Sequence, residues 1–420
     1  MSNRPAGGGA TAAFHVSALF IAALIAGCAA GEEPMPGAER SSSLASAAQP
    51  GGAGDGLIQR VARNSTTGDF DGDGLEDVAY GDRSWGAGTA CPAGFGAVVV
   101  HYGAEPTRGV RWARGAGLVG PTVCGAELGA AVGAADIDGD GYDDLVVGAP
   151  GATQGQIQVA FGAAAGLSRS RQTTIVGPSV DGPAAHFGAA IAAGDFNCDG
   201  HADVAVGAPD ADAGSIADAG SVTILPGRPT GIATTGPRLL QDAAGDPPES
   251  GDRFGFALAA GNLDAVGPDE CGCDDLAISA TFEDVAGVQD AGVVHVLFGG
   301  QAGPGSDGAE TIPTAGPLAP RRGQDTGARL GIGDIDGDGI ADLSVALVAS
   351  GQIAWLAGGR DGLGGAHVGA DDLVLEETCG GGTLEGKVTI TDIVIRWGPF
   401  DCDHCCGPGN CCSGGSCGGD

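Results

Sequence analysis

The sequence has few basic side chains. Lysine and arginine together number 19, against 53 aspartates and glutamates, which leaves a formal net charge of −34. A chain this acidic repels nucleic acid and anionic lipid, so neither is expected as a direct partner, and cations are its natural complement. The acids are either spread over the surface or gathered around bound metal, and their positions decide between these possibilities.

Aromatic residues are also scarce, at 5% of the chain, whereas glycine supplies 82 of the 420 residues. This balance disfavours long amphipathic helices and suits short strands joined by tight turns. A hydrophobic fraction of 43% is still sufficient for a core, and the length allows one large domain or two ordinary ones. We therefore expect an all-β fold.

Apolar segments long enough to cross a membrane are missing as well. Residues 14–26 are apolar but too short for a comfortable span, and no later segment is apolar enough. With Arg4 before it and Ile25-Ala26-Gly27-Cys28 at its end, this segment has the features of an export signal. It resembles a bacterial lipobox, which implies that residues 1–27 are a lipoprotein signal peptide and that Cys28 carries lipid. An ordinary cleaved signal is the alternative.

The residue after this cysteine is Ala29 rather than an aspartate. By the same resemblance, this indicates an outer-membrane lipoprotein, exported to the cell envelope or cell surface. Residues 28–56 consist mainly of Ser, Ala, Gly and Pro, with too little apolar surface to fold, so we predict a flexible tether. The membrane is then contacted through the lipid anchor only.

An acidic nonapeptide recurs along the rest of the chain. It reads DFDGDGLED, DIDGDGYDD, DFNCDGHAD and DIDGDGIAD in copies that start at Asp69, Asp136, Asp195 and Asp334. A further copy starts at Asn262 and is interrupted before Gly272. The spacings between successive starts are 67, 59, 67 and 72 residues. A repeated supersecondary unit of this size is therefore expected.

Each copy lies between two predicted strands, such as residues 187–194 before it and residues 204–209 after it. A more polar stretch, residues 171–176 for example, can supply the outermost strand. About four strands in about 60 residues make one blade of a β-propeller. The remaining strand of each unit is glycine-bounded and is predicted at residues 97–102, 156–161, 221–226, 293–298 and 352–357.

These units resemble FG-GAP repeats, which build the N-terminal propeller of integrin α subunits and occur in many bacterial surface proteins. The resemblance covers residues 57–360, and it implies an FG-GAP β-propeller domain over residues 57–365. Five repeats are counted, whereas family propellers often have seven blades. Residues 366–398 are expected to add strands that complete a sixth blade or close the ring. The naming residues are Phe187-Gly188 with Gly207-Ala208-Pro209, Leu128-Gly129 with Gly148-Ala149-Pro150, and Phe254-Gly255.

The nonapeptide has the composition of a calcium loop. Carboxylates at positions 1, 3, 5 and 9 and the main-chain carbonyl at position 7 can converge on one hard cation, and glycines at positions 4 and 6 permit the sharp turn. Position 12 is Tyr80, Val147, Val206 or Val345 instead of the acid that an EF-hand requires. By the resemblance, the ligands are Asp69, Asp71, Asp73, Leu75 and Asp77; Asp136, Asp138, Asp140, Tyr142 and Asp144; Asp195, Asn197, Asp199, His201 and Asp203; and Asp334, Asp336, Asp338, Ile340 and Asp342.

The interrupted copy would retain Asn262, Asp264 and Asp275, with Cys271 where an aspartate belongs. We thus expect about four Ca²⁺ ions, or five if this copy also binds. Carboxylates held this close repel one another unless a divalent ion neutralises them; plain acidic turns are the alternative. In the family the opposite face carries ligands, and the candidate loops here are residues 83–94, 209–219 and 281–291.

Twelve of the 13 cysteines remain when Cys28 is set aside, and in an exported chain disulfides are the default. The candidate pairs are Cys91 with Cys124, and Cys198 with either Cys271 or Cys273. Residues 399–420 change composition sharply and form a Cys-rich tail. We predict that this tail is either a small disulfide knot or a thiolate metal site that includes His404.

A convergent set of catalytic groups is not evident, so we do not expect an enzyme. Gly414-Gly415-Ser416-Cys417-Gly418 matches a hydrolase pattern but lacks the flanking strand and helix. The prediction is a recognition, adhesion or scaffold module for an extracellular protein or glycan. A calcium-dependent, lyase-like polysaccharide-degrading enzyme and a purely structural envelope protein are the alternatives. A single lysine, Lys387, and three tyrosines favour binding over catalysis.

Overall fold

The computed structural model describes residues 65–368, apart from residues 105–108, 121–122, 183, 265–271, 306–307, 313–314, 337, 361 and 365. The predicted signal peptide with Cys28, the tether, most of the predicted C-terminal strands and the Cys-rich tail lie outside the described residues. Within them, no helix is long and apolar enough to cross a membrane.

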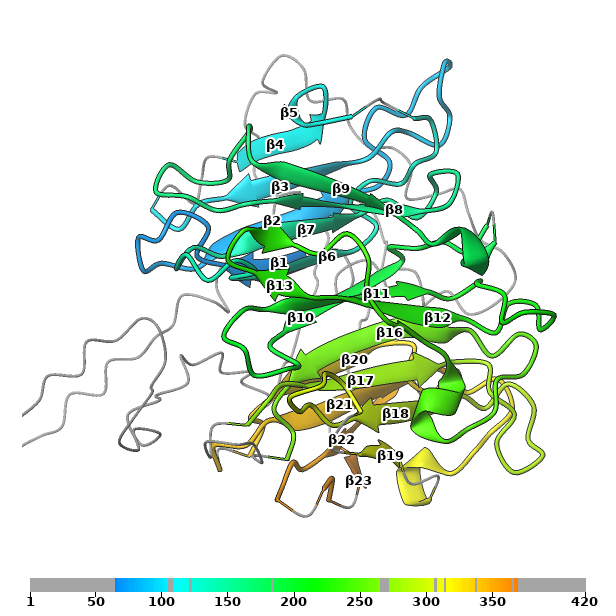
Figure 1. The fold of residues 1–420 in the computed structure, drawn as a ribbon. Coiled ribbons are helices and arrows are strands. Elements are labelled where there is room, and N and C mark those ends of the chain that lie inside the picture. Colours follow the sequence, from blue (N-terminus) through cyan, green and yellow to red (C-terminus); the bar gives the residue numbers. More distant parts are fainter. Residues whose placement is uncertain are drawn as a thin grey trace, which may run out of the picture. The chain divides into compact units, whose positions relative to one another are not determined.

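The described chain is built from antiparallel sheets that follow one another along the sequence (Figure 1). The first contains β1 (Ser65–Gly68), β2 (Asp77–Asp82), β3 (Ala97–His101) and β4 (Gly109–Arg114), with β5 (Gly117–Leu118) parallel to β4. The second contains β6 (Val132–Ala135), β7 (Asp144–Gly148), β8 (Gln156–Ala160) and β9 (Gln172–Val176). The third contains β10 (Ala190–Gly194), β11 (Asp203–Ala208), β12 (Ser221–Leu225) and β15 (Arg238–Leu239).

The same order continues in the last two four-stranded sheets. The fourth contains β16 (Phe254–Gly261), β17 (Asp275–Ala280), β18 (Val293–Leu297) and β19 (Ala309–Thr311). The fifth contains β20 (Leu330–Gly333), β21 (Asp342–Leu347), β22 (Gln352–Leu356) and β23 (Ala366–Val368). The shorter elements are a ribbon of β13 (Gly227–Arg228) and β14 (Gly231–Ile232), and the 3-10 turns η1 (Ser179–Asp181), η2 (Gln241–Ala244), η3 (Gly316–Leu318) and η4 (Val348–Ser350).

Consecutive sheets pack face to face. Successive residues of a strand point to opposite faces, so Leu145 and Val147 of β7 join a core with the first sheet while Val146 joins a core with the third. Two further clusters lie between the third and fourth sheets and between the fourth and fifth. The second and third strands therefore read as continuous apolar runs. The first strands also contact one another in sequence, β1 with β6, β6 with β10, β10 with β16 and β16 with β20.

Glycines allow this close packing. A Cβ on Gly207, in β11, would lie 2.2 Å from the carbonyl oxygen of Gly255 in the next sheet, and one on Gly148 would lie 2.1 Å from that of Gly188. Neighbouring sheets thus touch through their backbones at two kinds of glycine. One begins a Gly-Ala-Pro segment, as Gly148 and Gly207 do, and the other follows a phenylalanine, as Gly188 and Gly255 do. A short parallel bridge from Gly155 to Phe187 adds a hydrogen-bonded link between the second and third sheets.

The all-β fold class is confirmed, with blades at the predicted places: the described residues form one five-stranded and four four-stranded sheets, besides the ribbon of β13 and β14. The third strands match their predicted ranges, each one residue shorter at its end. The strand predicted over residues 187–194 begins only at Ala190. The reason is local, because His186 and Gly188 have φ angles of 56° and 90°, and this left-handed turn precedes the strand.

Candidate metal centre

The nonapeptide copies join the first and second strands of their sheets. In the complete copies, position 1 directly follows the first strand and position 9 is the first residue of the second strand. The antiparallel ladder pairs Gly68 with Asp77 and Ala135 with Asp144. Positions 1 and 9 are therefore brought together by strand pairing, and the seven residues between them form the loop.

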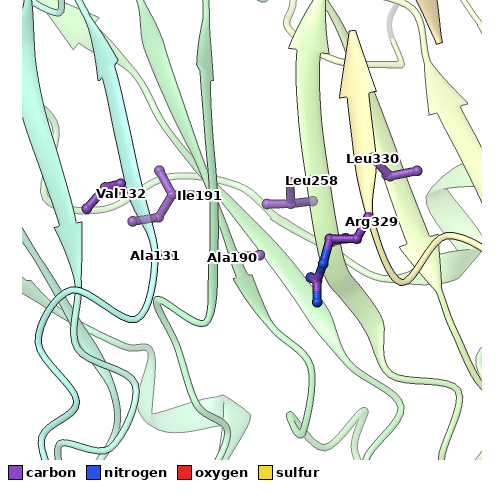
Figure 2. Close-up of a pocket in the computed structure, with 8 residues that line it drawn as sticks. Ala131, Val132, Ala190, Ile191, Leu258, Arg329 and Leu330 are labelled. Atoms are coloured by element: carbon purple, nitrogen blue, oxygen red, sulfur yellow. The ribbon is translucent and has the colours of Figure 1, made fainter. Parts of the chain in front are cut away.

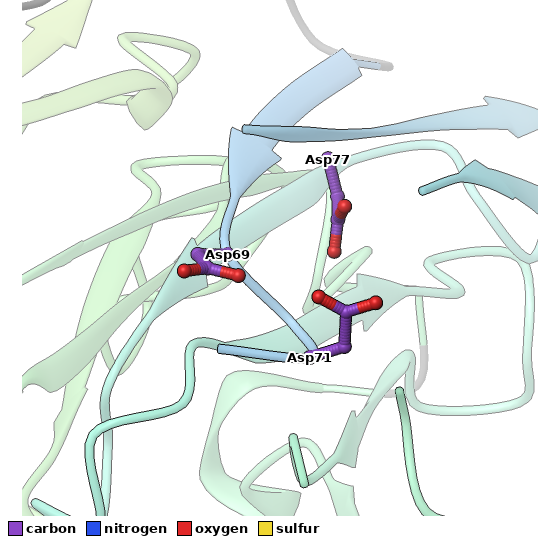
Figure 3. A group of neighbouring side chains, drawn as sticks. All are labelled: Asp69, Asp71 and Asp77. Carbon is purple, nitrogen blue, oxygen red and sulfur yellow. The ribbon is translucent and has the colours of Figure 1, made fainter. Parts of the chain in front are cut away.

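Carboxylates converge in three of these loops. Figure 3 shows Asp69, Asp71 and Asp77 of the first loop, with the carboxylates of Asp71 and Asp77 facing each other. In each group, one oxygen of every carboxylate lies within 4.8 Å of the others. The groups are Asp69, Asp71 and Asp77; Asp136, Asp138 and Asp144; and Asp334, Asp336 and Asp342.

The third loop has the same arrangement with an amide at position 3. Asn197 Nδ2 donates to Asp203 Oδ1 (3.3 Å) and Oδ2 (3.1 Å). Asp195 again occupies position 1 and accepts the N–H groups of Asp199 (3.1 Å) and Gly200 (2.9 Å). This loop therefore offers the oxygens of two carboxylates and one amide.

Backbone hydrogen bonds hold the ligand side chains in place. Asp69 accepts the N–H groups of Asp73 (3.1 Å) and Gly74 (2.9 Å), and Asp73 Oδ1 accepts that of Leu75 (2.8 Å). The position-5 carboxylate is thus hydrogen-bonded within its own loop and lies outside the convergent group. Asp140, Asp199 and Asp338, at position 5 of the other loops, accept the equivalent bond. At position 9, Asp77 accepts the N–H groups of Phe70 (2.9 Å) and Gly103 (2.7 Å), and Asp144, Asp203 and Asp342 have equivalent partners.

The oxygens at position 3 are left without donors. Asp71 Oδ1, Asp138 Oδ1 and Asn197 Oδ1 are buried and accept no hydrogen bond. A buried oxygen without a donor is costly unless a cation coordinates it. The side-chain atoms that could coordinate a metal here are all carboxylate or amide oxygens. Such oxygens are the ligands of a hard cation, so Ca²⁺ fits this site.

Electrostatics also favour a cation. Burial is the main cause that raises the pKa of Asp77 to about 6, of Asp203 to about 7 and of Asp144 to about 8, and neighbouring aspartates raise them further. Burial and the adjacent acids likewise raise the pKa of Asp71 and Asp138. The acid groups of the loops therefore carry an excess of negative charge, which a divalent ion would neutralise.

The second loop differs from the others because an arginine reaches it. Arg171, directly before β9, forms an ion pair with Asp138, and its Nη1 donates to Asp140 Oδ2 (3.2 Å). Its guanidinium also lies over the ring of Phe161, 4.4 Å from the centroid. The arginine side chain thus partly neutralises this acid group, a contact that the nonapeptide alone does not predict.

The interrupted copy keeps only part of the pattern. Asp275 accepts the N–H groups of Leu263 (2.7 Å) and Gly299 (2.8 Å), as position 9 does elsewhere. Asn262 lies against Gly272, where a Cβ would come within 2.0 Å of Asn262 Nδ2. No convergent group of three acids is found among the described residues of this copy, which include Asp264 and Asp275. Cys271 lies outside the described residues.

Two disulfides are formed among the described residues, and each links segments of neighbouring units. Cys91 pairs with Cys124, as predicted, and Cys198 pairs with Cys273, which decides between the two predicted partners. Cys198 is at position 4 of the third loop, and Cys273 is at position 7 of the interrupted copy. The same two positions meet in the first junction, where Tyr142 lies over Gly72.

The predicted ligand loops do connect second to third strands, at the end of the sheets opposite the metal loops. Asp210, in the loop after β11, contacts His186 Nδ1 (2.5 Å) in the segment before β10 and Arg253 Nε (2.9 Å) directly before β16 of the next sheet. The hydrogen bond to Asp210 raises the pKa of His186. Figure 2 shows a small pocket between the first strands, lined by Arg329 and by seven apolar residues, Ala131, Val132, Ala190, Ile191, Ala257, Leu258 and Leu330.

The family model described as "FG-GAP repeat" matches residues 128–160 and 187–225. The chain contains FG-GAP repeats. This FG-GAP protein is 31% identical over 186 residues to the phosphatidylinositol-glycan-specific phospholipase D of Rattus norvegicus, covering 41% of this chain and 20% of that one. It is 35% identical over 170 residues to integrin alpha-4 of Xenopus laevis, covering 39% and 15%. The similarity therefore spans a fifth or less of these relatives.

Solved structures add only a weak likeness. The exotype rhamnogalacturonan lyase YesX aligns with a TM-score of 0.38 and 11% identity, over 72% of this chain and 48% of that one. The Bacillus licheniformis rhamnogalacturonan lyase PL11 aligns with a TM-score of 0.34 and 12% identity, over 74% and 57%. At these scores the likeness carries no argument about function.

Proposed function

We propose that this FG-GAP protein is a calcium-dependent recognition module of the cell surface that binds an extracellular protein or glycan. The observation that carries the proposal is the convergence of three carboxylates in each of three hairpins, with the position-9 aspartate buried in each, together with position-3 oxygens that accept no hydrogen bond in three loops. Asp71, Asp138, Asn197 and Asp336 would hold the ions with the aspartates at positions 1 and 9. The bound ions would neutralise these hairpins and fix the turn between the first two strands.

Ligand binding is assigned to the opposite end of the sheets. The loops over residues 83–94, 209–219 and 281–291 and the connections between sheets lie there. Arg83 pairs with Glu127 (3.5 Å), and Asp210 pairs with both His186 and Arg253, so charged groups of different sheets are held side by side. Such a composite surface depends on the packing of the sheets, and calcium supports that packing.

Two measurements test the proposal. Calorimetric titration of chelator-treated protein with CaCl₂ should give about four sites, with dissociation constants on the order of 10⁻⁴ to 10⁻³ M, as is usual for extracellular modules. Glycan and protein arrays should then show saturable binding in calcium and none in EGTA. Absence of calcium binding, or array binding that is indifferent to EGTA, would refute the proposed function. An array without any saturable ligand would support a purely structural role instead.

Anchoring through Cys28 is the part of the proposal that concerns location. We expect cells grown with an alkyne fatty acid to label the wild-type chain and to leave the variant C28A unlabelled. The variant should be released from the membrane fraction. Labelling of C28A to the wild-type level would exclude this anchor.

A further inference from the structure

Neighbouring metal loops are joined by a recurring backbone hydrogen bond. In each described junction, the N–H of position 8 in one copy donates to the carbonyl of position 1 in the preceding copy. These bonds run from Asp143 to Asp69 (3.0 Å), from Ala202 to Asp136 (3.0 Å), from Asp274 to Asp195 (3.0 Å) and from Ala341 to Asn262 (3.2 Å). The loops therefore form a connected series.

Two of the junctions contain a second bond, made by a side chain. The Asp69 N–H donates to Asp143 Oδ2 (2.8 Å), and the Asp195 N–H donates to Asp274 Oδ2 (2.8 Å). At the other two junctions position 8 is an alanine and this bond cannot form. Asp143 is thus hydrogen-bonded to both the N–H and the carbonyl of Asp69, whose side chain is a proposed calcium ligand.

The surrounding sequence is adapted to this side chain. A Cβ on Gly68 would lie 2.9 Å from Asp143 Oδ2, and one on Gly194 would lie 2.7 Å from Asp274 Oδ2. At the junction where position 8 is Ala202, the residue equivalent to these glycines is Ala135. Both junctions that have the aspartate therefore also have the glycine, the second junction has neither, and the fourth has Gly261 together with Ala341.

We propose that Asp143 couples the first two calcium sites, so that calcium in the second loop strengthens binding in the first; this rests on the proposed function. Asp143 directly precedes Asp144, a ligand of the second loop, and its carboxylate binds the backbone of Asp69, a ligand of the first loop. An ion that fixes Asp144 also fixes Asp143, which then holds Asp69 in place. The first loop loses less conformational freedom on binding, and this is positive cooperativity.

A natural reporter lies at this junction. Tyr142 belongs to the second loop and covers Gly72 of the first, where a Cβ would come within 2.5 Å of its ring. A tyrosine this near to a bound terbium ion sensitises its luminescence, and terbium replaces calcium in oxygen sites. Terbium titration of the full, oxidised chain therefore reports the first two loops.

The test is a double-mutant cycle in terbium binding. D138A removes a ligand of the second loop, so the remaining Tyr142-sensitised signal comes from the first. We expect D138A and D143A each to weaken terbium binding in the first loop about fivefold or more, and the double variant to be no weaker than either. Equal first-loop affinity in wild type and D143A, or fully additive losses, would overturn the coupling.

Further variants separate coupling from charge and from folding. D143N keeps an oxygen that accepts the Asp69 N–H, so it should bind terbium as the wild type does; behaviour like D143A would overturn the proposal. E76A is the matched control, since Glu76 holds position 8 in the first copy and is exposed.

If D143A does not fold, the gain variant A135G/A202D should make the second and third loops cooperative. A wild type without terbium luminescence would instead refute the proposed function itself.

Discussion

At the scale of single residues, position 3 of the metal loops is the most informative. Its oxygen accepts no hydrogen bond in three loops, whereas positions 1, 5 and 9 are all bonded to backbone N–H groups. Asp138 pairs with Arg171 and Asn197 donates to Asp203, whereas Asp71 contributes little to the fold without metal and would contribute a ligand with metal. A substitution there separates the two effects.

The variant D71A should lose stability only when calcium is present, because Asp71 Oδ1 accepts no hydrogen bond. Loss of one site with a dissociation constant near 10⁻⁴ to 10⁻³ M removes about 1–3 kcal/mol in about 10 mM calcium. Without calcium the variant should melt at or above the wild-type temperature, because one repelling carboxylate is gone. Thermal unfolding with CaCl₂ and with EGTA measures both. The exposed Asp242 provides the control, D242A, which should be neutral in both buffers.

Glu283 gives a pH dependence that is independent of metal. Burial is the main cause that raises its pKa from 4.5 to about 7; Asp252, Asp246 and Glu249 add to this, and the hydrogen bond from Gln241 Nε2 (2.8 Å) opposes it. The folded state therefore holds a proton that the unfolded chain has lost, and stability declines as the pH rises from about 4.5 through 7.

The variant E283Q should remove this decline. We expect it to match the wild type near pH 4 and to exceed it at about pH 8 by no more than about 3 kcal/mol, since each pH unit between the two pKa values corresponds to about 1.4 kcal/mol. Urea unfolding at the two pH values gives the difference. If both proteins lose stability in parallel as the pH rises, Glu283 is not the group responsible. D242N should follow the wild type.

At the scale of elements, the close contact between neighbouring sheets depends on glycine. The variant G207A would place a methyl group 2.2 Å from the carbonyl oxygen of Gly255, so the third and fourth sheets must separate. We expect a loss of about 1–3 kcal/mol or more in denaturant unfolding. G88A is the matched control, because a Cβ there meets nothing within 4 Å, and it should be neutral. A wild-type midpoint for G207A would show that the contact is readily relieved.

The strands were predictable because apolar runs bounded by glycine recur in register with the acidic motif. The start of β10 was not, since the left-handed turn at His186 depends on packing against the neighbouring sheet. The choice of Cys273 over Cys271 as partner of Cys198 also required the fold. It follows from the contact between position 4 of one loop and position 7 of the next, which a single copy cannot reveal. In the same way, the doubled aspartates at Asp143-Asp144 and Asp274-Asp275 were visible, but their role between loops was not.

At the scale of the whole molecule, the excess negative charge should control stability through ionic strength. Without calcium, the net charge of −34 includes acid groups held close together, so added salt should screen their repulsion. We expect NaCl to raise the unfolding temperature strongly in EGTA and only slightly in saturating calcium. Equal salt dependence in the two buffers would show that the repulsion lies elsewhere than in the loops. The measurement is a pair of melting series at constant pH.

The groups at the end of the sheets where we propose ligand binding could not be predicted from the sequence, for a physical reason. They come from separate sheets, as with Asp210, His186 and Arg253, and only packing brings them together. The metal ligands, by contrast, lie within nine consecutive residues, so one loop contains its own pattern. The convergence of carboxylates within one loop could therefore be predicted from the sequence, whereas contacts between groups of separate sheets could not.

The division of the hydrophobic core among pairs of adjacent sheets has an evolutionary consequence. Each apolar cluster involves one sheet and its neighbour, and none of the four clusters extends over more. Duplication or deletion of a unit leaves the remaining interfaces intact, because in such arrays stability is approximately a sum over neighbours. The gene can accordingly gain or lose repeats by recombination, and individual repeats can diverge, as the interrupted copy has, without unravelling the rest.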